Sequence, residues 1–154
     1  MPGAGKTYLS LKLAEEIQGE FDYLIWRSLY EQPPLNDLLT NLIEFLSDAA
    51  EVDLPETTMG KISLLIKYLR QHRCLLIFDG FEALFKSGEK AGTYLPGYEE
   101  YGELVQKVGE LQHKSCLLVT SREKPGKVFT LEGDFLPVRT LVLKGLQPVA
   151  AECI

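Results

Sequence analysis

The 154-residue sequence has few cysteines, no cluster of basic residues and no long apolar run. Its three cysteines cannot pair evenly, and Cys74 and Cys116 lie inside apolar runs, so we expect reduced thiols rather than the disulfide framework of a small secreted protein. No segment approaches the ~20 apolar residues of a membrane-spanning helix. The first residues also lack the apolar segment of a signal peptide. These absences predict a cytoplasmic protein without a membrane partner.

The charge balance is mildly acidic, with 16 Lys and Arg against 22 Asp and Glu and a formal net charge of −6. Such a chain lacks the basic surface that attracts nucleic acid. Its length is sufficient for one domain with its own hydrophobic core, so we expect a single domain over residues 1–154.

Short apolar runs alternate with longer amphipathic stretches along the chain, which predicts an α/β domain. The continuous apolar run at 74–79 is typical of a strand buried on both faces of a parallel sheet. A further helix is expected to begin near Gln147 and Pro148. The predicted strands are 23–29, 74–79, 115–121 and 139–143, and the predicted helices are 6–18, 35–47, 59–72 and 98–112.

The first residues match the end of the phosphate-binding pattern G-x-x-x-x-G-K-[ST], without its first glycine. Glycines allow the backbone to approach phosphate oxygens, and the start of a helix adds its positive dipole end. In this pattern Lys6 reaches the β- and γ-phosphates and Thr7 offers its hydroxyl to Mg²⁺. The competing interpretation is a flexible glycine-rich segment that happens to precede a helix. The expected nucleotide-binding residues are Pro2, Gly3, Ala4, Gly5, Lys6, Thr7 and Tyr8.

A metal-holding acid is expected at the end of a neighbouring strand, and Asp79 ends the apolar run at 74–79. Thr7 and Asp79 are therefore the predicted metal-binding residues. ATP-hydrolysing members of this broad class commonly have a second acid next to the first, but Gly80 stands there. Glu82 is the nearest substitute, either as a catalytic group or as a solvated turn residue. We therefore expect at most a slow ATPase.

Arg122 follows the predicted strand at 115–121. In open α/β sheets ligands lie beyond the carboxyl ends of the strands, so this guanidinium is expected to face the phosphates. The alternative is an ordinary surface arginine. Asp79, Glu82 and Arg122 form the expected catalytic set.

These motifs together resemble the NB-ARC domains of the STAND class of signalling NTPases, which are related to AAA+ ATPases. The similarity covers almost the whole chain and is greatest to the bacterial, particularly cyanobacterial, form that precedes WD repeats. It rests on the Walker A motif at 3–7, the strand at 21–29 with its tryptophan, the Walker B motif at 75–79, the sensor strand at 117–122, and the short segments 97–99 and 121–125.

The resemblance implies a P-loop NTPase fold, a three-layer αβα sandwich with a mostly parallel sheet. It also implies binding of ATP or ADP with Mg²⁺, slow hydrolysis or none, and a nucleotide-controlled switch between a closed monomer and an assembled oligomer. Expected partners are the nucleotide, further copies of the chain, and fused ARC and WD-repeat regions.

The chain departs from the family at both ends. It starts inside Walker A, so the central strand before that motif is missing, and it ends before the helical ARC region. A core fragment is therefore expected, in which the strand at 117–121 lacks a neighbour on one side.

Two alternatives to a signalling switch remain open at this point. One is a freestanding P-loop ATPase or kinase, although a kinase needs an arginine-rich second substrate site and the five arginines here do not cluster. The other is a non-functional fragment of a split reading frame.

Overall fold

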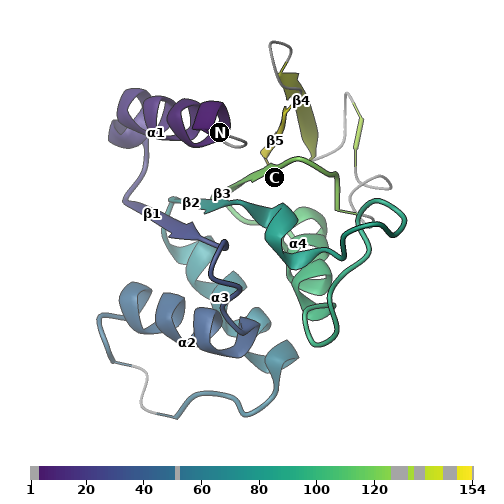
Figure 1. The fold of residues 1–154 in the computed structure, drawn as a ribbon. Helices are drawn as coiled ribbons and strands as arrows, with labels where there is room; N and C mark the ends of the chain where they lie inside the picture. The colour runs from purple at the N-terminus through teal and green to yellow at the C-terminus, as the bar shows by residue number, and fades with distance from the viewer. Residues whose placement is uncertain (1–3, 51–52, 126–131, 134–137, 144–148, 154) are drawn as a thin grey trace.

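The structure, a computed structural model, describes residues 4–50, 53–125, 132–133, 138–143 and 149–153 (Figure 1). Its two short 3₁₀ helices are η1 (Gln18–Glu20) and η2 (Phe81–Leu84). The α-helices are α1 (Ala4–Ile17), α2 (Leu35–Leu46), α3 (Thr58–Gln71) and α4 (Glu100–Glu110), and the strands are β1 (Tyr23–Ser28), β2 (Cys74–Asp79), β3 (Cys116–Ser121), β4 (Arg139–Leu143) and β5 (Val149–Cys153).

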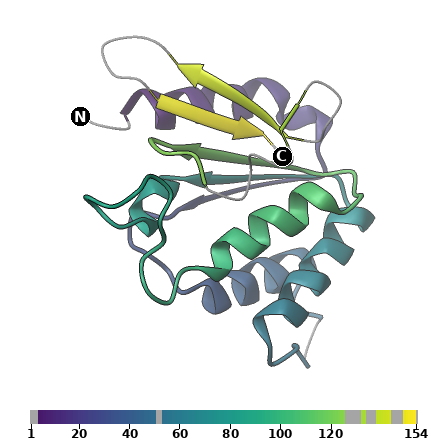
Figure 2. The same ribbon diagram turned by 90° about the vertical axis from the view of Figure 1, so that its right-hand side faces the viewer.

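The strands form one sheet in the order β1-β2-β3-β5-β4. The pairs β1–β2 and β2–β3 are parallel, whereas β3–β5 and β4–β5 are antiparallel. Helix α1 lies on one face of the sheet, and α2, α3 and α4 lie on the other (Figure 2). This three-layer arrangement around parallel strands confirms the predicted α/β, P-loop NTPase-like fold class.

Strand β2 lies between β1 and β3, and all six of its residues are buried. Successive side chains of a strand point to opposite faces of its sheet. Leu76 and Phe78 accordingly join the large apolar core shared with α2, α3 and α4, while Leu75 and Ile77 pack in a smaller cluster with Ala14 of α1. Both faces of β2 are covered, which explains why its sequence is continuously apolar until Asp79.

The expectation that the strand at 117–121 lacks a neighbour is wrong. Strand β3 pairs with β2 on one side, with Leu76 opposite Leu117, and with β5 on the other, with Leu118 opposite Cys153. The expected final helix is also wrong, because residues 149–153 form β5. Buried backbone N–H and C=O groups need hydrogen-bond partners, and pairing with both β3 and β4 outweighs local helical preference in this segment.

The cysteines follow the sequence expectation only in part. Cys74 is a buried free thiol, and burial raises its pKa. Cys116, in contrast, is disulfide-bonded.

Within the described ranges, no helix combines the length and the apolar composition that a bilayer crossing requires.

Candidate functional site

The carboxyl ends of β1, β2 and β3 meet the beginning of α1, and polar side chains gather there in an otherwise apolar interior. Helix α1 contributes Lys6 and Thr7 from its first turn. Strand β2 contributes Asp79 at its last position, and η2 contributes Glu82. These residues lie more than seventy positions apart in the sequence, so the parallel pairing of the strands and the placement of α1 bring them together.

Asp79 is the centre of a hydrogen-bond network and is only 1 % exposed. The Thr7 hydroxyl donates to Asp79 Oδ2 at 2.7 Å, and the Thr120 hydroxyl donates to Oδ1 at 2.6 Å. The backbone N–H of Gly80 donates in turn to Thr120 Oγ1 at 3.0 Å. Both carboxylate oxygens therefore have a donor, which fixes the orientation of the carboxylate. The two predicted metal-binding residues, Thr7 and Asp79, are in direct contact.

Lys6 forms the second polar contact of the site. Its side chain is fully buried, and its Nζ lies 2.8 Å from Glu82 Oε1, in a salt bridge in which the Glu82 side chain is 15 % exposed. A buried ammonium group needs an anionic partner, because leaving it unpaired costs several kcal/mol, of the order of 3–5. In this structure the partner is Glu82. The other oxygen, Glu82 Oε2, is buried and has no hydrogen-bond partner among the described residues.

Tyr30, just after β1, covers the position that follows Asp79. Gly80 has a φ of +84°, and a Cβ built on it would lie 2.5 Å from two atoms of the Tyr30 ring. The Tyr30 hydroxyl lies 3.5 Å from Glu82 Oε1. Burial, together with the negative charges of Glu82 and Asp79, raises the pKa of Tyr30 to about 12. Position 80 thus has neither the backbone conformation nor the space that an acidic side chain requires.

Arg122 lies at the carboxyl end of β3 but takes no part in the hydrogen bonds around Asp79 and Lys6. It directly follows β3, is exposed, and has no hydrogen bond or ion pair among the described residues. Its positive charge acts to lower the pKa of Tyr30, which indicates that it lies near the Tyr30 hydroxyl. Arg122 is therefore close to the site without contacting it.

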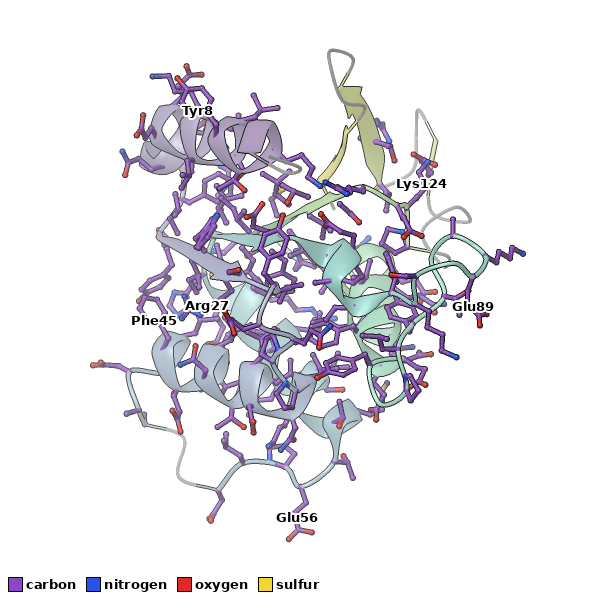
Figure 3. The ribbon with its side chains drawn as sticks, in the orientation of Figure 1. Tyr8, Arg27, Phe45, Glu56, Glu89 and Lys124 are labelled. Carbon is purple, nitrogen blue, oxygen red and sulfur yellow. The ribbon has the colours of Figure 1, made fainter. Side chains whose placement is uncertain are left out.

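Of the remaining expected nucleotide-binding residues, Ala4, Gly5 and Tyr8 lie in the first turns of α1. Pro2 and Gly3 lie outside the described residues, Ala4 begins the helix, and Gly5 is exposed. The Tyr8 side chain is 67 % exposed and points away from the sheet (Figure 3).

Two residues of the site, Thr120 and Tyr30, are absent from the sequence-based set. Thr120 is the register partner of Asp79 in the β2–β3 pair, so a correct parallel alignment of the two strands would have identified it. Nothing in the sequence distinguishes Tyr30 from any other aromatic residue after a strand.

The chemistry of these groups suits a phosphate ester and a divalent cation. A buried lysine binds phosphate oxygens through the positive charge of its ammonium group. Hydroxyl and carboxylate oxygens such as those of Thr7 and Asp79 are ligands that Mg²⁺ prefers, and Mg²⁺ is commonly bound through one or two carboxylates plus substrate phosphates. Across the part of the chain that the structure describes, no group of three or more His, Cys, Asp or Glu side chains could hold a metal by itself.

Comparison with known families identifies the chain. The NB-ARC domain family matches residues 1–82, more than half of the sequence. The chain belongs to the NB-ARC family. An uncharacterized WD repeat-containing protein of Nostoc sp. (strain PCC 7120) is 48 % identical over 155 aligned residues. That alignment covers 96 % of this chain but only 12 % of the relative, so the NB-ARC chain spans a small part of the protein that it matches. No solved structure matches significantly.

These findings confirm the resemblance to an NB-ARC domain of the kind that precedes WD repeats. NB-ARC membership makes the chain a nucleotide-binding signalling module of the P-loop NTPase type, for which the implied ligands are ATP and ADP. The family match covers the Lys6–Thr7 segment, Asp79 and Glu82, the same residues that the fold brings together.

Proposed function

We propose that this NB-ARC domain binds ATP or ADP with Mg²⁺ at the junction of α1 and β2, as the nucleotide switch of a STAND-type signalling NTPase. The observation that supports it best is the direct contact between Thr7 and Asp79, at 2.7 Å, beside the buried amine of Lys6. Walker A and Walker B residues need this proximity to share one nucleotide and its metal ion.

Each residue has a distinct role in this proposal. Backbone groups of residues 2–5 and the Tyr8 N–H surround the phosphates, and Lys6 pairs with the β- and γ-phosphates. The Thr7 hydroxyl and the Asp79 carboxylate hold Mg²⁺, which supplies neutralisation of phosphate charge when it is bound. Arg122, exposed and without an ion-pair partner in the described part of the chain, is available to approach the γ-phosphate from the end of β3.

Hydrolysis is proposed to be slow or absent. Gly80, with its φ of +84° and the Tyr30 ring over it, leaves no room for the second acid that positions water in hydrolytic relatives. Glu82 is the remaining carboxylate, and its Oε1 is engaged by Lys6. We expect turnover far below the median enzyme value of about 10 s⁻¹ in a phosphate-release assay. A fast rate that Glu82→Gln abolishes would instead identify Glu82 as the catalytic base.

Nucleotide titration of two lysine variants tests the binding proposal. Lys6→Ala should weaken ATP and ADP binding at least tenfold, about 1.4 kcal/mol or more, because it removes a charge-assisted contact to phosphate. Lys12→Ala is the matched control, since Lys12 is on the same helix with its side chain 55 % exposed. Titration calorimetry on both folded variants gives the comparison. Unchanged affinity in the Lys6 variant, or equal losses in both, would remove the P-loop assignment.

The chain is also proposed to act as one part of a longer protein. Residues 1–154 form the partial nucleotide-binding domain, and fusion to ARC and WD-repeat regions or self-association converts nucleotide state into a signal. The support is the WD repeat-containing relative, whose length far exceeds the aligned segment. Size-exclusion chromatography of a parent protein that contains this domain, with ATP and with ADP, tests the switch: a nucleotide-independent size contradicts it.

A further inference from the structure

The buried amine that the proposed function assigns to phosphate is already paired with a carboxylate. We propose that Glu82 is a built-in competitor of the nucleotide: it neutralises Lys6 in the nucleotide-free chain, and incoming phosphate must displace it. This inference rests on the proposed nucleotide binding at Lys6. It assigns Glu82 a regulatory effect on affinity that is separate from any part in hydrolysis.

Burial of Lys6 makes this competition unavoidable. Its side chain is fully buried, and Glu82 Oε1 at 2.8 Å is its anionic partner. Water cannot replace that partner at a site without solvent exposure, so Lys6 must keep an anion nearby. A phosphate oxygen that reaches the same amine therefore takes the position of the carboxylate, and nucleotide affinity is reduced by the free energy of the existing pair.

Glu82 is suited to release because little else holds its carboxylate. Its Oε2 has no hydrogen-bond partner among the described residues, and the Tyr30 hydroxyl approaches Oε1 only to 3.5 Å. The contrast with Asp79 is direct, since both Asp79 oxygens accept short hydrogen bonds from threonine hydroxyls. Of the two carboxylates at the site, Asp79 is fixed in place and Glu82 is held mainly by the amine for which phosphate competes.

The Glu82 side chain is also more accessible to solvent than the Lys6 side chain. The side chain of Glu82 is 15 % exposed, although Oε2 itself is buried, whereas the Lys6 side chain is fully buried. Glu82 belongs to the short helix η2, which is preceded by Gly80 in a left-handed conformation. Asp79 belongs to β2, and the hydrogen bonds that hold it come from Thr7 and Thr120, so release of Glu82 leaves those bonds intact.

Calorimetric titration of the 154-residue chain with ADP tests the proposal. Glu82→Gln keeps the shape of the side chain and removes its charge. We expect this variant to bind ADP about five- to tenfold more tightly than the unmodified chain, because Lys6 no longer has a full ionic partner to lose. Glu15→Gln is the control for net charge, since Glu15 is on α1 with its side chain 70 % exposed, and it should leave the affinity unchanged.

Combining Glu82→Gln with Lys6→Ala separates competition for Lys6 from long-range repulsion between the Glu82 charge and the nucleotide. If Glu82 acts through Lys6, Glu82→Gln should no longer improve affinity once Lys6 is replaced by alanine. An equal improvement in both backgrounds would overturn the proposal, because it would show that the carboxylate only repels the nucleotide at a distance. Unchanged or weaker ADP binding by folded Glu82→Gln would also overturn it while leaving nucleotide binding itself intact.

Two further results complete the test. Glu82→Asp retains the charge but shortens the side chain by one methylene, so the pair with Lys6 is broken and an intermediate gain in affinity is expected. Failure of the unmodified chain and of Glu82→Gln alike to bind ADP would overturn the proposed function and this inference together. Circular dichroism of each variant confirms that the comparison is made on folded protein.

Discussion

Gly80 is the position where the structure makes its sharpest stability prediction. Replacement by alanine introduces a Cβ at a φ of +84° and within 2.5 Å of the Tyr30 ring. The backbone conformation alone costs about 1–2 kcal/mol for a residue with a side chain. Displacing the ring adds up to about 1 kcal/mol, because Tyr30 is 44 % exposed and the contacting atoms lie at the far end of its side chain. Gly80→Ala should therefore lower the free energy of unfolding by about 1–3 kcal/mol.

Gly97 provides a matched control for the backbone part of this cost. It has a φ of +88°, but a Cβ there would meet nothing within 4 Å. Gly97→Ala should therefore show only the conformational penalty of about 1–2 kcal/mol. The difference between the two variants measures the contact with Tyr30. In a Tyr30→Ala background that difference should disappear, because the ring that blocks the Cβ is gone.

Urea unfolding of these variants, followed by circular dichroism, gives the free energies from the shift of the midpoint at unchanged slope. Equal destabilisation by Gly80→Ala and Gly97→Ala would refute the reasoning, since Tyr30 would then not occupy the space beside Gly80. A difference that persists without Tyr30 would refute it as well. Either result would reopen position 80 to an acidic side chain and would weaken the argument for slow hydrolysis.

Three further predictions concern single side chains of the site. Thr7→Ala should weaken nucleotide binding only when Mg²⁺ is present, because its hydroxyl acts on the metal; calorimetry with and without a chelator separates the two conditions. Arg122→Ala should reduce the preference for ATP over ADP and leave ADP affinity nearly unchanged, whereas equal losses would indicate a general phosphate contact. In the Tyr30→Phe variant, the free energy of unfolding should fall less steeply at high pH than in the unmodified chain. The pKa of Tyr30 is raised from 10.0 to about 12 in the fold, so its contribution is complete below pH 10 and is lost as the pH rises to about 12, where urea unfolding at several pH values can detect it.

The helices and strands up to residue 121 were predictable because their periodicity is local. The apolar run that ends at Asp79 has the composition of a doubly covered strand, and the structure buries all of it. Lys6, Thr7 and Asp79 were predictable as a group because the phosphate-binding pattern fixes residue types at fixed spacing. For these elements, pattern and tertiary structure agree.

The parts that could not be predicted depend on which segments become neighbours. Thr120 joins Asp79 only through the register of β2 and β3. The contact between Lys6 and Glu82 depends on where η2 places its first turn relative to α1. Residues 149–153 form a strand rather than a helix because β3 and β4 both present backbone groups to them. None of these contacts can be predicted from the local amino-acid composition.

The central claim is that nucleotide binds where α1 meets the end of β2. Amide chemical-shift mapping of the isotope-labelled 154-residue chain, titrated with ADP and Mg²⁺, tests it residue by residue. The account predicts that the largest shifts fall on residues 4–8 and 79–82, and that Lys6→Ala removes them at the same nucleotide concentration. Shifts concentrated instead on α2 and α3, or unchanged spectra at saturating nucleotide, would contradict it.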